Sequence, residues 1–159
     1  MKNLHIFNVT NRTDPILDEL YCEPAGVGPN DFPKNYLDSK TGDNIIHKDP
    51  YYAEYIFHYW FWKNQLMNYE KSSWIGFCQY RRYWLNENSD QNLIITRENL
   101  KDNMLKDIPS IWSNHETVVA KRVYVNNPKF MKLIKRGFKN IISDPSVIFD
   151  KKKHNIKKL

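Results

Sequence analysis

Residues 74–84 contain two consecutive arginines with aromatic residues on both sides. The run reads Trp-Ile-Gly-Phe-Cys-Gln-Tyr-Arg-Arg-Tyr-Trp, and its first six residues have the pattern of a buried strand. A guanidinium group is a planar fork of donors that suits phosphate, and aromatic rings offer flat faces to a base or a sugar. Arg81 and Arg82 are therefore candidates for binding a phosphate group. Tyr80 and Tyr83 lie beside the arginines in the sequence, and the four residues form the predicted ligand-binding set at this strand end.

Strand geometry divides these side chains between two faces. Alternate residues of an extended backbone share a face, so Gln79 and Arg81 would lie together while Arg82 points the other way. One arginine would then face a ligand while its neighbour braces the fold. The alternative is that both arginines only form ion pairs with carboxylates such as Glu54.

Glu54 is a candidate for a catalytic position. Asp49-Pro50 joins an N-cap residue to a proline, which predicts a helix start, and Glu54 lies one turn into that helix. Its carboxylate would either pair with one of the arginines or accept the proton of a substrate hydroxyl. We prefer the ion pair and keep the base as the second interpretation.

Asp43 and Asn44 lie in the turn before this helix. Together they would bind a ribose or sugar hydroxyl, with Asp43 as acceptor and Asn44 as both donor and acceptor. An Asx turn that only shapes the loop is the competing interpretation, and the neighbouring Gly42 favours it slightly.

Aromatic residues make up 14% of the chain, a surplus that serves either a ligand cleft or a core built with rings. In the predicted helix over 50–68 a set of residues recurs at spacings of three and four, which predicts one aromatic-rich stripe that faces inward. The set consists of Tyr52, Ile56, Tyr59, Trp60, Lys63 and Leu66. Within this helix we expect Tyr52, Trp60 and Trp62 to form the wall of a sugar or acceptor site.

Metal ligation is not expected. The chain contains no Asp-x-Asp triplet, and the pairs Asp43/His47 and Glu54/His58 have helical spacing but lack a third ligand. We expect no cofactor and no divalent metal, and an arginine in the place of the cation.

Charge is distributed unevenly. Residues 1–120 hold 12 Lys and Arg against 16 Asp and Glu, a net charge of −4, whereas residues 121–159 hold 12 against 2, a net charge of +10. The basic end is either a solvated tail or a contact with phosphates of lipid, lipid-linked substrate or nucleic acid. Nucleic acid is disfavoured, because single-strand binders interleave basic and aromatic residues and this chain separates them.

The order of predicted elements indicates an α/β fold with a mostly parallel sheet flanked by helices. We expect one domain over 1–150 and a basic tail over 151–159. Two cysteines without paired spacing, no apolar leader and no long apolar run favour a cytoplasmic protein. The expected elements are a strand over 4–9, irregular chain over 10–49, a helix over 50–68, a strand over 74–79, a helix over 96–107, a strand over 117–120 and a helix over 127–142.

Two stretches of the chain resemble a bacterial glycosyltransferase family of capsular and exopolysaccharide synthesis, long catalogued as a domain of unknown function. The family pattern runs G-D-N-I, N-P-Y-Y-x-E-L-T, Y-W-x-W-K-N and then Y-I-G-L-x-H-Y-R-R-Y-F. The matching residues here are Gly42, Asp43, Asn44, Ile45, Pro50, Tyr51, Tyr52, Glu54, Tyr59, Trp60, Trp62, Lys63, Asn64, Ile75, Gly76, Tyr80, Arg81, Arg82 and Tyr83. Weaker support extends from about residue 26 to residue 122.

This resemblance implies a fold like that of nucleotide-diphospho-sugar transferases. It also implies transfer of a sugar from a nucleotide sugar to a lipid-linked or polysaccharide acceptor, at the inner face of the cytoplasmic membrane. The resemblance makes Gln79 the second candidate for a catalytic position, because the family has histidine there. The chain departs from the pattern at this position and at Tyr55-Ile56, where the family has Leu-Thr. Family members are also longer, so this chain would be either a C-terminally truncated domain or a divergent short member. A non-catalytic or degenerate glycan-binding or nucleic-acid-binding module is the alternative function.

Overall fold

The computed structural model describes residues 4–79, 82–90, 93–121, 138 and 141–142. It divides into two compact units, Met1–Glu116 and Thr117–Leu159. Within the described residues, every strand lies in the first unit. The elements named below are β1 (Leu4–Thr10), β2 (Glu23–Gly26), β3 (Leu37–Asp38), α1 (Asp49–Tyr52), α2 (Tyr55–Asn64), η3 (Leu66–Asn68), β4 (Trp74–Gln79) and α3 (Arg97–Asn103).

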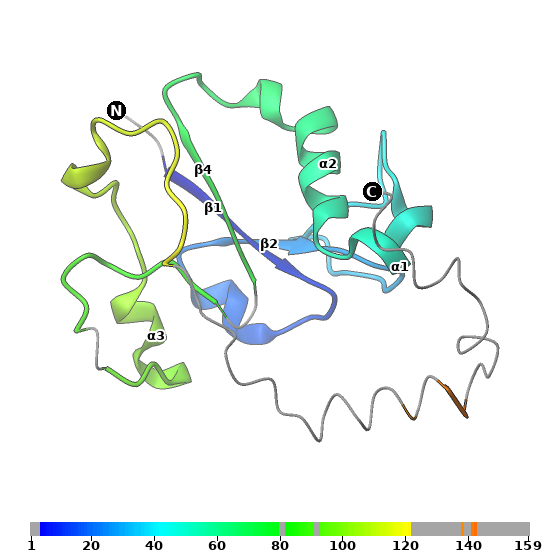
Figure 1. Cartoon of the computed structure of the whole chain (residues 1–159), viewed down its shortest axis with the longest axis horizontal. Helices are drawn as coiled ribbons and strands as arrows, with labels where there is room; N and C mark the ends of the chain where they lie inside the picture. Colours follow the sequence, from blue (N-terminus) through cyan, green and yellow to red (C-terminus); the bar gives the residue numbers. More distant parts are fainter. Residues whose placement is uncertain (1–3, 80–81, 91–92, 122–137, 139–140, 143–159) are drawn as a thin grey trace. The chain divides into compact units, whose positions relative to one another are not determined.

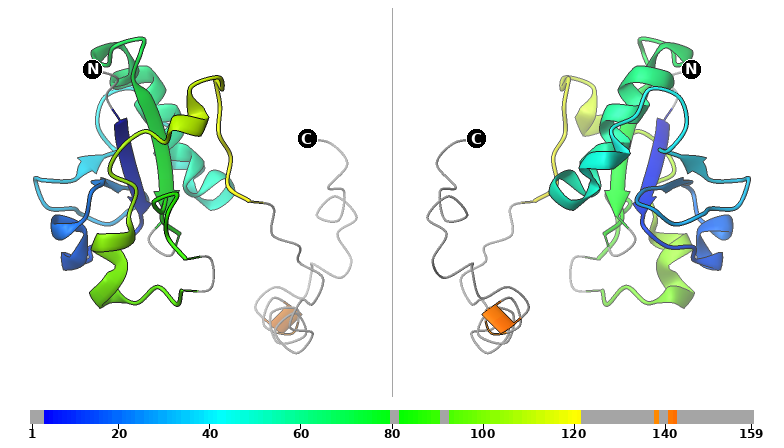
Figure 2. Two further views of the ribbon diagram at one scale, coloured as in Figure 1. Left: turned by 90° about the vertical axis from the view of Figure 1, so that its left-hand side faces the viewer. Right: turned by 90° about the vertical axis from the view of Figure 1, so that its right-hand side faces the viewer.

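The four strands form one sheet in the order β3-β2-β1-β4, and all three pairings are parallel. β1 is central and pairs with β4 along six positions, from Leu4 opposite Trp74 to Val9 opposite Gln79. Figure 2 shows β1 and β4 side by side with their arrowheads at the same end. The expected α/β class with a mostly parallel sheet is confirmed, and the strand over 74–79 has the predicted bounds.

Alternation along β1 gives each face of the sheet its own core. Phe7 and Val9 pack against Ile56 and Phe57 of α2. Ile6, on the opposite face, packs with residues that include Cys78 of β4 and Leu105, which follows α3. The sheet is therefore covered on both faces, as parallel sheets require (Figure 1).

The stretch expected to be irregular, residues 10–49, contains two short strands. β2 was missed because Pro and Gly are rare in strands, so Glu-Pro-Ala-Gly carries no strand signal. Pro24 is tolerated because β3 pairs only with Ala25 and Gly26, which leaves the outer edge of β2 open at the proline.

The single helix expected over 50–68 is broken at Ala53, whose φ is 44° and ψ is −120°. The predicted N-cap is also wrong, because Asp49 is the first residue of α1 and the N-cap position is Lys48, which makes no side-chain capping hydrogen bond. After the break, α2 buries Ile56, Phe57, Trp60 and Phe61 against the sheet. The predicted inward stripe is therefore correct at Ile56 and Trp60 only.

The helix expected over 96–107 begins as predicted, since the backbone amide of Thr96 donates to Asn99 Oδ1 at 2.8 Å. It ends earlier, at Asn103. The strand expected over 117–120 is not formed. The helix expected over 127–142 lies outside the described residues apart from Phe138, Ile141 and Ile142, which are helical. Among the residues that are described, no helix has the length and apolar character to cross a membrane.

Candidate functional site

A cavity of about 570 Å³ lies at the carboxyl edge of the sheet, and we call it the edge cavity. Its lining comes from the ends of β1, β2 and β4 and from the α1–α2 junction. The lining residues are Val9, Thr10, Asn11, Val27, Gly28, Pro29, Asn30, Asp49, Ala53, Glu54, Gln79 and Arg82.

The position of the edge cavity follows from the strand order. The chain leaves β1 toward β2 on one side, whereas β4 pairs with the other side of β1. Open parallel sheets bind their ligands in the crevice that such a reversal leaves outside the carboxyl ends of the strands. The edge cavity is therefore the location where this fold is expected to bind a ligand.

Gln79 and Arg82 both line the edge cavity. The amide of Arg82 donates to the carbonyl of Gln79 at 2.8 Å, and the amide of Gln79 donates to the carbonyl of Arg82 at 3.2 Å. This antiparallel bridge means that the backbone does not continue as an extended strand. The predicted separation of Gln79 and Arg82 onto opposite faces is therefore wrong.

Glu54 reaches the same cavity from the α1–α2 junction, together with Asp49. Glu54 is half-buried. No ion pair between Glu54 and Arg82 occurs within the part of the chain that the structure describes. The residues that line the cavity thus include one with a guanidinium (Arg82), two with carboxylates (Asp49 and Glu54) and three with side-chain amides (Asn11, Asn30 and Gln79).

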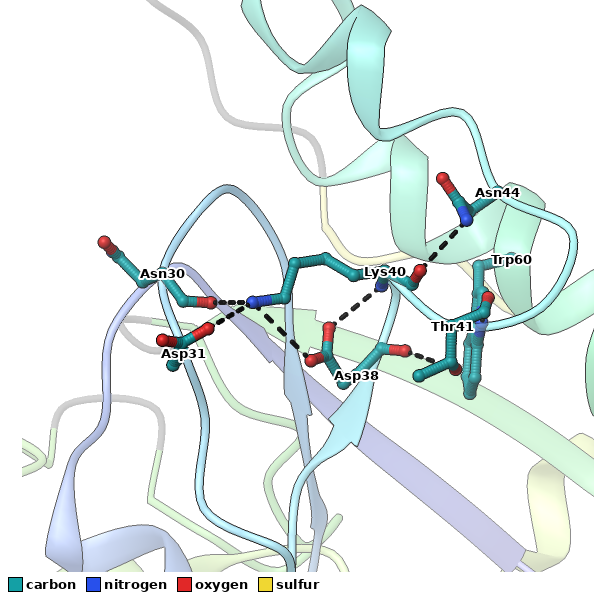
Figure 3. A network of polar contacts seen from close by, with 7 residues as sticks. All are labelled: Asn30, Asp31, Asp38, Lys40, Thr41, Asn44 and Trp60. Carbon is teal, nitrogen blue, oxygen red and sulfur yellow. Dashed lines mark hydrogen bonds and ion pairs between the residues drawn. The ribbon is translucent and has the colours of Figure 1, made fainter.

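Gly28, Pro29 and Asn30 form the β2 side of the edge cavity, and the structure holds them in two ways. Gly28 has a φ of 94°, a conformation that favours glycine. The Lys40 ammonium donates to the carbonyl of Asn30 at 2.7 Å and to Asp31 Oδ1 at 2.8 Å (Figure 3). Lys40 thereby ties the cavity loop to the chain that follows β3.

Asp43 and Asn44 do not line the edge cavity. Asn44 Nδ2 donates to the carbonyls of Lys40 and Gly42 at 3.0 Å each, and Asn44 Oδ1 accepts the amide of Ile46 at 3.3 Å. Asn44 therefore forms the Asx turn that was the competing interpretation. Asp43 Oδ1 accepts the Tyr59 hydroxyl at 3.1 Å, which ties the turn to α2.

The three residues expected to form a sugar wall are separated. Trp60 is 3% exposed and belongs to the core, where its indole Nε1 donates to the carbonyl of Thr41 at 2.7 Å. Figure 3 shows Trp60 beside Thr41, at one end of the Lys40 network. Tyr52 and Trp62 are exposed on the helices but do not line the edge cavity.

Tyr83 lines a second cavity, of about 350 Å³, together with Arg12, Asp14 and Arg97. Burial and the nearby thiols and Asp14 raise the pKa of Tyr83 to about 12. Arg97 forms an ion pair with Asp14 at 2.6 Å. Tyr83 is thus separate from the edge cavity, while Tyr80 and Arg81 lie outside the described residues.

No group of three or more metal-ligating side chains occurs among the described residues. The polar lining missed from the sequence consists of Thr10, Asn11, Asn30 and Asp49. These residues were hard to predict from the sequence, because the pattern of a turn-rich segment does not indicate which of its residues meet at a sheet edge.

The fold and the edge cavity define the class: an α/β protein with a ligand-sized cavity at the carboxyl ends of a parallel sheet. Among protein-family models, the one described as domain of unknown function DUF4422 matches residues 5–155. The chain therefore belongs to the DUF4422 family. Comparisons with curated proteins and with solved structures gave no match.

Proposed function

We propose that the chain is a glycosyltransferase that binds a nucleotide-sugar donor in the edge cavity and moves the sugar to a surface-polysaccharide acceptor. The observation that carries this proposal is that Glu54, Gln79 and Arg82, distant along the sequence, line one cavity of about 570 Å³. Such a volume is within the range of small-ligand sites. The resemblance at residues 42–84 supports the same reaction class.

Arg82 is the group we assign to the diphosphate. Its side chain is exposed into the edge cavity and has no ion pair among the described residues. A guanidinium binds phosphate oxygens through two parallel hydrogen bonds and keeps its charge at any physiological pH. It would stabilise the negative charge that develops on the departing diphosphate.

Glu54 is the group we assign to the acceptor. In the transfer step the acceptor oxygen forms a bond to the anomeric carbon, and the bond from that carbon to the diphosphate oxygen breaks. The diphosphate leaves with the electron pair, and the acceptor hydroxyl proton passes to the Glu54 carboxylate. Gln79 has no basic atom, so in this scheme it contributes hydrogen bonds only.

The acceptor would be lipid-linked or polymeric, and the reaction would take place in the cytoplasm at the membrane. The net charge of +10 in residues 121–159 supports this part of the proposal. Lysines near an anionic surface each contribute on the order of 1 kcal/mol to binding.

Release of nucleoside diphosphate from a panel of nucleotide sugars tests the proposal. We expect release from one donor class, unaffected by EDTA. In Arg82→Ala and Glu54→Gln, we expect release to fall by about 100-fold or more. Exposed Lys101→Ala on α3 is the matched control and should keep the wild-type rate. Release that is absent with every donor would favour a non-catalytic or degenerate binding module.

A further inference from the structure

Helix α2 carries apolar side chains on two opposite faces. Its inner face is buried against the sheet. Its outer face presents Tyr55, Tyr59 and Trp62, which follow one another at spacings of four and three residues and therefore share one side of the helix. We call these three residues the ring stripe. Tyr55 is 67% exposed and Trp62 is 56% exposed. A surface helix normally carries polar residues on its outer face, so the exposed rings of the stripe indicate a binding surface for a partner.

The rings of the stripe are held in place by their neighbours. Tyr59 and Trp62 meet edge to face, with ring centroids 5.9 Å apart. The Tyr59 hydroxyl donates to Asp43 Oδ1. The Lys63 ammonium lies 4.1 Å from the Trp62 ring centroid. Side chains fixed in this way lose little conformational freedom when a partner binds.

The composition and charge of this surface favour a glycan chain. The C–H groups of a pyranose form an apolar face that packs on an aromatic ring, while its hydroxyls bond to water and to tyrosine hydroxyls. The helical rise places Tyr59 about 6 Å beyond Tyr55, and Trp62 about 4.5 Å further on, steps comparable to the length of a sugar unit. An anionic membrane is disfavoured, because residues 1–116 hold 12 basic against 16 acidic side chains.

We propose that the ring stripe binds the acceptor polysaccharide and guides it to the edge cavity. The stripe begins at Tyr55, the residue directly after the cavity-lining Glu54, so a chain stacked on α2 would end at the cavity. This inference rests on the proposed function, because the bound glycan is an acceptor only if the chain is a glycosyltransferase. It revises the expected sugar wall by replacing buried Trp60 with Tyr55 and Tyr59 and keeping Trp62.

Affinity electrophoresis of the full chain in native gels tests the inference. The gels contain hydroxyethyl cellulose, galactomannan, dextran or hyaluronan. Several polysaccharides are used because stacking depends on the face of the sugar ring and not on one type of linkage. We expect at least one polysaccharide to retard the chain. Tyr55→Leu and Trp62→Leu, which keep an apolar side chain but lose the ring, should each weaken binding by about tenfold. Trp62→Phe should restore part of it.

Met67→Ala is the matched control, because Met67 is 92% exposed on η3 outside the ring stripe, and its loss should change nothing. No retardation by any of the four polysaccharides would overturn the inference. Two other results would also overturn it. One is binding to phosphatidylserine vesicles that Trp62→Leu abolishes, and the other is dimer formation in sedimentation experiments that Trp62→Leu abolishes.

The failure of this inference is distinguishable from the failure of the proposed function. Arg82→Ala should leave retardation in the gels unchanged while it removes nucleotide binding. Retardation by a glycan without any nucleotide binding would sustain the ring stripe as a glycan site and refute the transferase.

Discussion

The backbones of Gln79 and Arg82 are joined by two hydrogen bonds, of 2.8 Å and 3.2 Å, at the end of β4. Gln79 and Arg82 line the same cavity, and Glu54 lines it as well. A phosphate held by Arg82 would therefore lie within the space that Gln79 also faces.

Gln79→His should raise the rate of sugar transfer. Gln79 is exposed in the edge cavity, so an imidazole fits without disturbing the core. An imidazole is a base near neutral pH and a side-chain amide is not, and a positioned base contributes about 100-fold or more. We expect at least about a tenfold gain in initial rate. An unchanged rate in a folded variant would show that position 79 is not a base position.

Trp60 and Trp62 should differ sharply in their effect on stability. Trp60 is 3% exposed and bonds to the Thr41 carbonyl, whereas Trp62 is 56% exposed. Trp60→Ala should lower the free energy of unfolding by about 3–5 kcal/mol, and Trp62→Ala by less than about 1 kcal/mol. Urea unfolding of both variants checks this. Equal losses would contradict the assignment of Trp60 to the core and of Trp62 to the surface.

Ala53→Gly should stabilise the chain. Ala53 has a φ of 44°, which strains a residue with a Cβ atom by about 1–2 kcal/mol and does not strain glycine. Part of this gain is offset by the greater freedom of glycine in the unfolded chain, so we expect about 1 kcal/mol. Ala25→Gly, in buried β2, is the control and should destabilise by about the same amount. A lower melting temperature for Ala53→Gly would refute the strained break.

His58 should make the fold sensitive to mild acid. Burial lowers its pKa below the ordinary 6.5, and the nearby Glu54 carboxylate only partly opposes this. The unfolded chain then binds the proton more readily, so stability is full above about pH 6.5 and falls as the pH drops below it. His58→Phe should reduce that fall in urea titrations between pH 7 and pH 5, and exposed His115→Phe should not. A wild-type slope in His58→Phe would contradict the assignment.

Part of the fold follows from local patterns. The mainly apolar stretches over 4–9 and 74–79 predicted strands, because a strand buried on both faces has a largely apolar sequence, and the structure forms them as Leu4–Thr10 and Trp74–Gln79. The break at Ala53 was not predictable, because alanine carries no helix-breaking signal. The strand β2 was missed because Pro24 and Gly26 are residue types that are rare in strands, and Pro24 is tolerated because the outer edge of β2 is open at that position.

The functional groups of the candidate site could be predicted from the sequence, but their arrangement in space could not. Arg82 and Glu54 were chosen by residue type and Gln79 by its place in the family pattern, and the structure brings these three to one cavity. The sequence did not indicate that the backbone of Arg82 would bond to Gln79, because no Gly or Pro marks a turn there. Asn44 was chosen as a sugar ligand, yet its side chain is used within its own turn.

Thermal stability with a panel of nucleoside diphosphates and nucleotide sugars tests the central claim most directly. The account predicts that one nucleotide class raises the melting temperature of the wild-type chain, that EDTA leaves this rise unchanged, and that Arg82→Ala abolishes it while Arg97→Ala does not. A rise that persists in Arg82→Ala, or no rise with any nucleotide, would contradict a donor site in the edge cavity.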